Sequence, residues 1–197
     1  MSAALAAGFA SPVHDAQAVF RCVMMAMARP GTVRRIAVPL DPPGCMQPAA
    51  AAAALALCDF ETPVWLDEAL SSHPHVREWL RFHTGAPVVA ASRAAAFAFV
   101  ADGRALPAFS TFALGTLDYP DRSVTAVVAV DALHEGMGWR LTGPGIPGET
   151  RFIAEGLPAD MLDRLAGNRG LFPRGIDIVL VCGDRIAALP RTTIVEA

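Results

Sequence analysis

The chain has 197 residues, of which 53% are hydrophobic and 18% charged, and its formal net charge is -3 at pH 7. A chain of this length buries roughly 70% of the surface that its unfolded form exposes, so it can hold a core without disulfides or metals, and we expect one domain over residues 1–197. Its longest apolar run, residues 49–58, is far shorter than the ~20 residues of a membrane-spanning helix, so we expect no membrane span.

The basic residues exclude two kinds of site. All sixteen are arginine, and the sequence contains no lysine. Without a lysine amine the chain cannot form a Schiff base with pyridoxal phosphate, and it cannot build the Gly-Lys-Ser/Thr of a phosphate-binding loop. Only Arg34 and Arg35 are adjacent and the chain is mildly acidic, so nucleic acid is not an expected partner. We expect no cofactor and no membrane partner.

The cysteines and the N-terminus indicate the compartment. Residues Met1–Ala10 are small and apolar but lack the basic residues of a signal peptide. The four cysteines show no paired spacing that would indicate disulfides or a zinc site. These features predict a cytoplasmic protein with reduced thiols. The cysteines are Cys22, Cys45, Cys58 and Cys182.

The N-terminal third alternates between helix and strand. Apolar side chains at a 3.6-residue spacing predict an amphipathic helix over residues 15–29, stopped by the Pro-Gly pair that follows. Residues 32–38 predict a strand near a sheet edge, because two arginines interrupt its apolar pattern. Residues 47–57 are rich in alanine, which favours helix and lets a helix lie close to its neighbour. Residues 62–66 predict a short strand.

The middle of the chain predicts one more helix and up to four strands. Residues 75–83 carry an apolar stripe at helical spacing and end at a Thr-Gly pair. Residues 87–91 are a strand candidate, and residues 95–100 favour either strand or helix because alanine dominates them. Residues 123–130, made of Val, Thr and Ala, predict a central strand, and residues 139–142 predict another.

A glycine-rich loop follows that strand. Gly143–Gly148 matches the spacing G-x-G-x-x-G of dinucleotide-binding proteins. In those proteins the glycine turn opens a helix at once, whereas Pro144 and Pro147 hold this backbone extended and the next predicted helix lies only at about residues 158–165. We therefore interpret the segment as a rigid loop at the end of a strand.

The C-terminal region predicts a buried hairpin. Ile176–Cys182 is a nearly unbroken apolar run, Gly183-Asp184 is a two-residue turn, and Ile186–Leu189 is a returning strand that Pro190 ends. Because the first run has apolar side chains toward both faces, we expect it in the middle of a sheet that is covered on both sides.

The order of these elements predicts the fold class. Helices and strands alternate, with neighbouring strands around residues 123–142 and 176–189. This order predicts an α/β fold with three layers, α/β/α, around one mixed sheet.

Metal and nucleophile sites are weakly supported. His73 and His75 form the only close histidine pair, and the proline between them sets the rings apart in a turn before a helix. No serine, threonine or cysteine lies in a nucleophile elbow, and Cys182 belongs to an apolar strand where a thiol acts as a small hydrophobic group. We expect no catalytic residue and no metal ligand.

Three polar patches are candidates for an anion pocket or an interface. Arg81-Phe-His-Thr84 places charged and polar groups at a helix end, Arg191 stands beside two threonines after a buried strand, and Tyr119, the only tyrosine, precedes the central strand together with Arg122. The alternative for each patch is capping and loop packing, in which carboxylate or backbone partners satisfy the same groups. The candidate residues are Arg81, His83, Thr84, Tyr119, Arg191 and Thr192.

Short motifs along nearly the whole chain resemble one protein family. Their order and spacing are similar to those of the H subunit (PhnH) of the bacterial carbon-phosphorus lyase pathway for phosphonate breakdown. The motifs are Asp15-Ala-Gln, Phe20-Arg21, Met27 with Pro30-Gly31, Thr62-Pro-Val-Trp-Leu66, Arg81-Phe-His-Thr84 with Ala86-Pro87, Leu141-Thr-Gly with Gly145-Ile146, and Phe172-Pro with Gly175-Ile-Asp177, Cys182-Gly183 and Pro190-Arg-Thr-Thr193.

The resemblance implies a fold, partners and a pathway. It implies a fold similar to the large domain of pyridoxal-phosphate-dependent transferases but without the cofactor, and a homodimer in isolation. It implies G, I, J, K and L partner subunits (PhnG, PhnI, PhnJ, PhnK and PhnL) in machinery that couples a phosphonate to the ribose of ATP and displaces adenine. The H subunit of this family has no assigned catalytic residue.

Two functions remain open at this point. The favoured one is an accessory, non-catalytic subunit that contributes an interaction surface to the carbon-phosphorus lyase complex, which makes ribose 1-phosphonate 5-triphosphate from ATP and an alkylphosphonate. The alternative is an autonomous nucleotide- or phosphonate-binding transferase that uses arginines as anion clamps.

Overall fold

The protein is described by a computed structural model over residues 5–197, so the first four residues of the apolar segment Met1–Ala10 lie outside the described part. The helices are α1 (Pro12–Ala28), α2 (Pro48–Leu57), α3 (Glu68–Ser71), α4 (Pro74–Thr84) and α5 (Met161–Gly170). The strands are β1 (Arg34–Arg35), β2 (Val64–Leu66), β3 (Phe97–Val100), β4 (Thr125–Ala129), β5 (Ala132–Thr142), β6 (Thr150–Glu155), β7 (Asp177–Cys182), β8 (Arg185–Leu189) and β9 (Ile194–Glu196).

A six-stranded mixed sheet forms the centre of the fold. Its strand order is β1-β8-β7-β4-β3-β2, in which β7, β4, β3 and β2 run parallel to one another and β8 and β1 complete the sheet with antiparallel pairing. The α/β class and the mixed sheet predicted from the sequence are confirmed. The hairpin β7–β8 is also confirmed, with β7 between two neighbours as its apolar run requires.

Alternating side chains of the central strands build two separate apolar clusters. In β4, Val127 and Ala129 belong to the cluster on the helical face, while Ala126 and Val128 belong to the cluster on the opposite face. Successive residues of a strand point to opposite faces, so a strand that is apolar at every position can serve both clusters. β7 follows the same pattern, and both strands are buried along almost their entire length.

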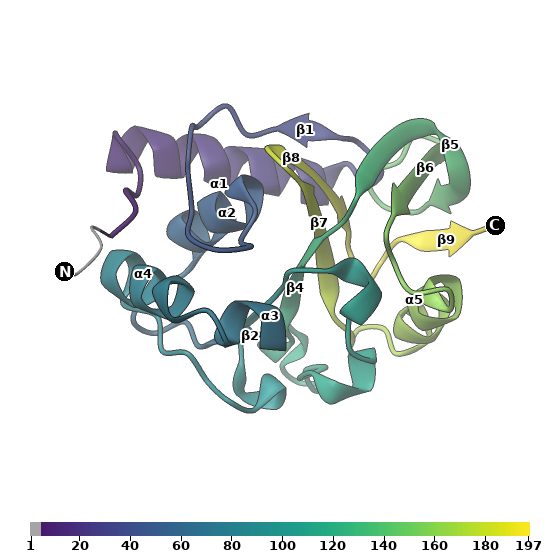
Figure 1. The fold of residues 1–197 in the computed structure, drawn as a ribbon. Coiled ribbons are helices and arrows are strands. Elements are labelled where there is room, and N and C mark those ends of the chain that lie inside the picture. The colour runs from purple at the N-terminus through teal and green to yellow at the C-terminus, as the bar shows by residue number, and fades with distance from the viewer. Residues whose placement is uncertain (1–4) are drawn as a thin grey trace.

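The two faces of the sheet are covered differently. Helices α1, α2 and α4 lie together on one face, and α5 gathers with β5, β6 and β9 on the other side of the molecule (Figure 1). The strands of this second group form their own antiparallel sheet in the order β6-β5-β9. The prediction that the second cover would be helical is therefore wrong in part, because a small sheet forms much of that layer.

The second sheet separates because β5 is apolar toward one side only. Leu133 and Leu141 are buried, whereas the polar His134 and Arg140, each next to one of these leucines and therefore on the opposite face, are only half-buried. A strand with one polar face cannot lie inside a sheet that is covered on both sides. The sequence analysis placed this strand among the neighbours of the central strand and found only its last residues, 139–142. It also missed β6 and β9 entirely.

Helix α2 is buried along most of its length. Ala49–Ala54 are all buried, which confirms that the small side chains let this helix approach the sheet. Its N-terminus also binds the hairpin turn, because the Ala49 N–H donates to the Gly183 carbonyl at 2.9 Å and the Gly183 N–H donates to Gln47 Oε1 at 2.8 Å. These bonds satisfy polar groups at the helix start that would otherwise lack a partner.

Several predicted boundaries move by a few residues. Helix α1 begins at Pro12 rather than Asp15, because Asp15 reaches back and accepts the Ser11 N–H at 2.8 Å from inside the first turn. The predicted strand at residues 87–91 is reduced to a bridge between Val88 and Val64. Residues 97–100 are strand, which resolves the alternative that the alanines left open.

The glycine-rich loop Gly143–Gly148 opens no helix. It connects β5 to β6, and the next helix, α5, begins only at Met161. The interpretation as a loop at the end of a strand is confirmed. Gly145 lies so close to the end of α1 that an added Cβ would stand 2.0 Å from the Ala28 carbonyl oxygen, so this position requires glycine.

Candidate functional site

The first predicted patch lies at the C-terminal end of α4. Arg81 is exposed and lines a surface hollow of about 490 Å³ together with Arg77, Glu78 and the chain from Gly85 to Val88. Arg77 and Arg81 are four residues apart and therefore share one face of the helix. The carboxylate of Glu78 lines the same hollow, so part of the positive charge there has a neighbouring negative charge.

His83 and Thr84 serve the end of this helix. The Thr84 hydroxyl donates to the Leu80 carbonyl at 2.7 Å and accepts the Ala86 N–H at 3.0 Å. The His83 ring lies 5.0 Å from the ring of Trp79, and its Nε2 lies 3.0 Å from the Ala6 carbonyl oxygen. These contacts match the capping and packing alternative that the sequence analysis kept open.

Arg191 is the centre of a buried polar network. Its guanidinium forms an ion pair with Asp177 at 2.5 Å, and the two side chains are only 14% and 17% exposed. It also donates to Ser123 Oγ at 2.5 Å and to the Pro120 carbonyl at 2.8 Å. Nη1, the nitrogen that donates to Pro120, also lies 3.4 Å from the Pro173 carbonyl oxygen. Arg191 therefore joins three segments of the chain that are distant in sequence.

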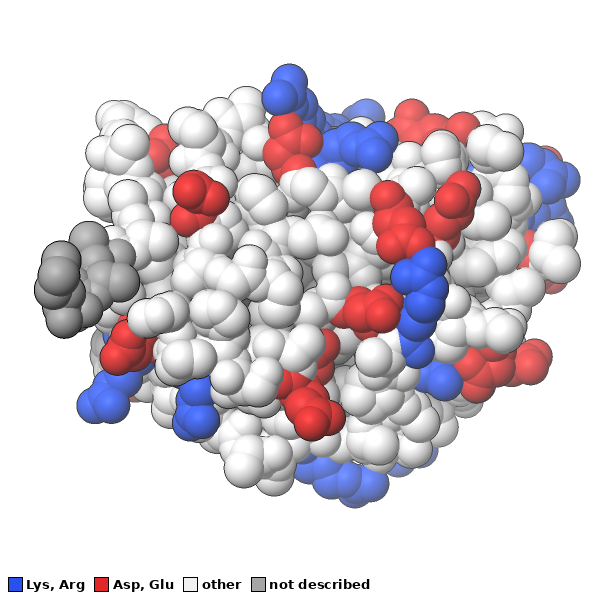
Figure 2. Space-filling model, viewed as in Figure 1, with Lys and Arg blue, Asp and Glu red and all other residues white. Residues whose placement is uncertain are grey.

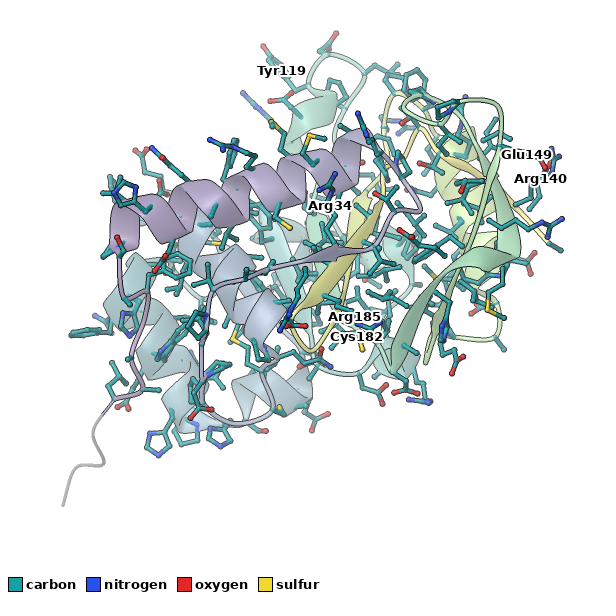
Figure 3. All side chains as sticks on the ribbon, turned by 90° about the horizontal axis from the view of Figure 1, so that it is seen from above. Arg34, Tyr119, Arg140, Glu149, Cys182 and Arg185 are labelled. Atoms are coloured by element: carbon teal, nitrogen blue, oxygen red, sulfur yellow. The ribbon has the colours of Figure 1, made fainter. Side chains whose placement is uncertain are left out.

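Tyr119 belongs to the same neighbourhood as Arg191. The guanidinium carbon of Arg122 lies 4.1 Å from the centre of the Tyr119 ring, a cation–π contact in the turn before β4. Tyr119 is exposed and stands at the periphery of the molecule, away from the hairpin end marked by Cys182 and Arg185 (Figure 3). Thr192 follows Arg191, and its carbonyl lies against Gly143, where an added Cβ would stand 3.1 Å away.

The structure adds two arginines that sequence reasoning missed. Arg93 and Arg174 line a second hollow of about 490 Å³ together with Arg122. We call this site the arginine hollow. Its other lining residues are Ser110, Phe112, Ala113, Leu114, Gly115 and Thr116. Nothing in the sequence places residues 93, 122 and 174 together, because they come from three separate connections between strands.

The six predicted residues do not form one pocket. The hollow at Arg81 and the arginine hollow share no lining residue. Two of the three patches, those of Tyr119 and Arg191, meet beside the arginine hollow, because Arg191 binds the chain at Pro120 and Pro173, close to Arg122 and Arg174. Basic side chains are visible along the lower edge of the molecule in Figure 2, where the teal helical turns of Figure 1 lie.

The described residues contain neither a cluster of metal ligands nor a helix that could span a membrane. Over residues 5–197, histidine, cysteine, aspartate and glutamate side chains nowhere gather in threes with the geometry of a metal site. The rings of His73 and His75 lie 5.7 Å apart, without a third ligand beside them in this range. Within the same range, each helix is too short or too polar to cross a lipid bilayer.

Comparison with known proteins gives a consistent result over nearly the whole chain. A family model described as "Bacterial phosphonate metabolism protein (PhnH)" matches residues 7–196. The "Alpha-D-ribose 1-methylphosphonate 5-triphosphate synthase subunit PhnH" of Rhizobium meliloti (strain 1021) is 47% identical over 188 residues, which is 95% of this chain and 94% of the relative. A protein of Stutzerimonas stutzeri, "Putative C-P lyase subunit protein HtxG", is 39% identical over 106 residues, 54% of each chain.

Proposed function

The chain belongs to the PhnH family of bacterial phosphonate metabolism proteins, and from this premise we propose that it is a subunit of the enzyme complex that makes ribose 1-methylphosphonate 5-triphosphate. The observation that carries the proposal is the 47% identity with a subunit of that synthase over 94% of the relative's length. A match of this extent includes both sheets and all five described helices, so it concerns the whole fold rather than one motif.

We propose an accessory role for the subunit within this complex, without catalytic residues of its own. Its partners would be the G, I, J, K and L subunits. Edges of the two sheets support this role, because within residues 5–197 the strands β1, β6 and β9 each have a neighbour on one side only, and an edge strand offers unpaired backbone groups to another chain.

Co-expression tests the proposal directly. A tagged form of this chain, expressed together with the G, I and J subunits of the same host, should retain all three through affinity purification and gel filtration in fixed proportions. An unrelated tagged protein of similar size serves as the control. Elution of this chain free of the other subunits, under conditions where those subunits associate with one another, would contradict the proposal.

A transferase activity of the isolated protein is the second candidate function. The arginine hollow carries three guanidinium groups that suit an anion, which favours an autonomous nucleotide- or phosphonate-binding transferase. Incubation of the isolated protein with ATP and methylphosphonate separates the two functions. Adenine release by the isolated chain would support the transferase, whereas release only after addition of the other subunits would support the accessory role.

The proposal also covers the domain organisation, the fold similarity and the oligomeric state that the family resemblance implies. We propose that residues 1–197 form one PhnH-like domain, that the fold is similar to the large domain of pyridoxal-phosphate-dependent transferases, and that the isolated protein is a homodimer. The mixed sheet with four parallel strands is compatible with that fold. Sedimentation equilibrium tests the dimer. The cytoplasmic location stays a prediction, as does any role of Arg81, His83, Thr84, Tyr119, Arg191 and Thr192 in a pocket or interface.

A further inference from the structure

We propose that the arginine hollow binds a polyphosphate chain. Its three cationic side chains come from the helical turn Ser92–Ala94, the helical turn Pro120–Arg122 and the connection between α5 and β7. The residues that line it include no aspartate or glutamate. A hollow that is lined by three arginines and by no aspartate or glutamate attracts a ligand with several negative charges.

The guanidinium groups of the hollow keep free donors. Arg93 uses one of its donors, Nη2, for the Ser110 carbonyl at 2.7 Å. The guanidinium carbon of Arg122 lies 4.1 Å from the centre of the Tyr119 ring, and within residues 5–197 its side chain forms no ion pair. The buried Nε of Arg174 has no hydrogen-bond partner within residues 5–197. This nitrogen is therefore not engaged by an acceptor of the protein, and the guanidinium of Arg174 is not held in an ion pair within the described residues.

Ion pairs do not neutralise these arginines. Over residues 5–197, Arg93, Arg122 and Arg174 form no salt bridge, although Asp118 and Asp121 lie in the same turn as Arg122. Arg191 gives the contrast, because its donors are used on Asp177, Ser123 and two carbonyl groups. Arg191 therefore holds the site, and the other three arginines remain available to a ligand.

The backbone around the hollow is fixed before any ligand arrives. Arg191 binds the Pro120 carbonyl, two residues before Arg122, and lies within reach of the Pro173 carbonyl, one residue before Arg174. Gly115 packs against this turn, and an added Cβ would stand 2.8 Å from the Pro120 carbonyl oxygen. A preformed site binds more tightly because less ordering is needed when the ligand arrives.

Charge favours a polyphosphate over a single phosphate, and the hollow is large enough to hold either. The volume of about 490 Å³ is within the range of roughly 300–1,000 Å³ that is typical of small-molecule sites. One phosphate ion carries at most two charges near neutral pH and would leave at least one of the three arginines unmatched. The identification of this ligand as the triphosphate end of the synthase substrate rests on the proposed function, because the relative's named product carries a 5-triphosphate.

Isothermal titration of the full-length protein with inorganic triphosphate, diphosphate and phosphate tests the site. Triphosphate should bind about tenfold or more tightly than phosphate, and its affinity should fall with added salt. Arg93→Gln, Arg122→Gln and Arg174→Gln should each weaken triphosphate binding about tenfold. Arg21→Gln, which removes an exposed arginine from α1, is the matched control and should leave the affinity unchanged.

A second measurement localises the ligand. Tyr119 is the only tyrosine and lies against Arg122, so protein labelled with 3-fluorotyrosine gives a single ¹⁹F signal beside the hollow. Triphosphate should shift this signal saturably in the wild type and in Arg21→Gln, and about tenfold more triphosphate should be needed in Arg174→Gln. Circular dichroism of each variant checks that it is folded.

The outcomes separate this inference from the proposed function. The inference is overturned if triphosphate does not bind, if the three variants bind it as the wild type does, or if Arg21→Gln weakens binding as much as they do. In that case the chain can still co-purify with its partner subunits. If triphosphate binds at the hollow but the chain does not join the complex, the result supports the binding site and contradicts the accessory role.

Discussion

At the scale of single residues, the ion pair of Arg191 with Asp177 is the most buried of those in the described residues. The sequence analysis named Arg191 as a candidate anion clamp, because a guanidinium next to two hydroxyls has the right chemistry. The local sequence does not show that Asp177, fourteen positions earlier at the start of β7, lies beside Arg191. Local chemistry thus identified an important arginine, and only the pairing of β7 with β8 shows which group that arginine contacts.

Removal of this pair should destabilise the protein strongly. Asp177→Ala leaves the half-buried guanidinium without its charge partner, and loss of one partner of a buried pair costs about 3–5 kcal/mol. Urea unfolding followed by circular dichroism measures the loss. Asp184→Ala breaks the exposed pair with Arg35 and is the matched control, expected to lose little stability. If both variants lose the same free energy of unfolding, the buried Arg191 pair contributes no more to stability than the exposed Arg35 pair.

The cysteines should differ in reactivity. Burial, with a smaller contribution from the nearby charge of Asp59, raises the pKa of Cys58 to about 12, whereas Cys45 is exposed. In the folded protein at pH 8, iodoacetamide should therefore modify Cys45 and spare Cys58, as peptide mass spectrometry can show. In urea both should react. Rapid modification of Cys58 without denaturant would contradict the burial of this thiol.

The same shift predicts how stability depends on pH. The unfolded Cys58 thiol ionises near its ordinary pKa of about 8.5, and the folded thiol keeps its proton until about pH 12. The unfolded state therefore binds fewer protons than the folded state between these values. The contribution of Cys58 to stability is complete below about pH 8.5 and is lost as the pH rises toward 12. Urea midpoints of wild type and Cys58→Ala, compared at pH 7.5 and 10, measure this difference.

At the scale of elements, the sequence predicted best where one physical signal was strong. The hairpin β7–β8, the central strand β4 and the helix α4 were found because their apolar patterns, turns and caps agree. Strand β9 was missed because it has three residues and none of them is buried, and β6 was missed although Phe152 and Ala154 alternate with more exposed residues. Their pairing with β5 is a long-range contact that no local pattern specifies.

Helix α2 should tolerate no larger side chain at its centre. Ala52 is fully buried, so Ala52→Leu adds three carbon atoms where there is no space and should cost about 1–3 kcal/mol or more. Ala18→Leu, at an exposed position of α1, is the matched control and should change the unfolding free energy little. Urea denaturation measures both. A stable Ala52→Leu protein would show that α2 can move away from the sheet.

At the scale of the whole molecule, both apolar clusters share the same central strands. Amides of β4 and β7 should therefore exchange with deuterium most slowly, because opening either strand disrupts both clusters at once. Amides of β1 and β9, which pair on one side only, should exchange fastest among the strands. Mass spectrometry of peptic fragments measures the order. Slower exchange in β5 and β6 than in β4 would contradict it.

The arginine hollow also depends on the fold of the whole molecule. It uses three connections that are neighbours only after the parallel strands have assembled. The family resemblance indicated a subunit of a phosphonate pathway from the sequence, but it could not place this site. Prediction of the pathway and prediction of the pocket thus depend on different information, one on motif order and the other on strand order.

The position of β7 in the sheet affects how the chain folds while it is being translated. The chain leaves the ribosome from its N-terminus, yet β7 joins β4 only after β5, β6 and α5 have been made, and β1 waits for β8, about 150 residues later in synthesis. Until then the edge of β4 that pairs with β7 and the side of α1 that packs against β8 have no partner. The nascent chain should therefore depend on chaperones for most of its translation, and fragments that stop before β7 should be degraded or aggregate.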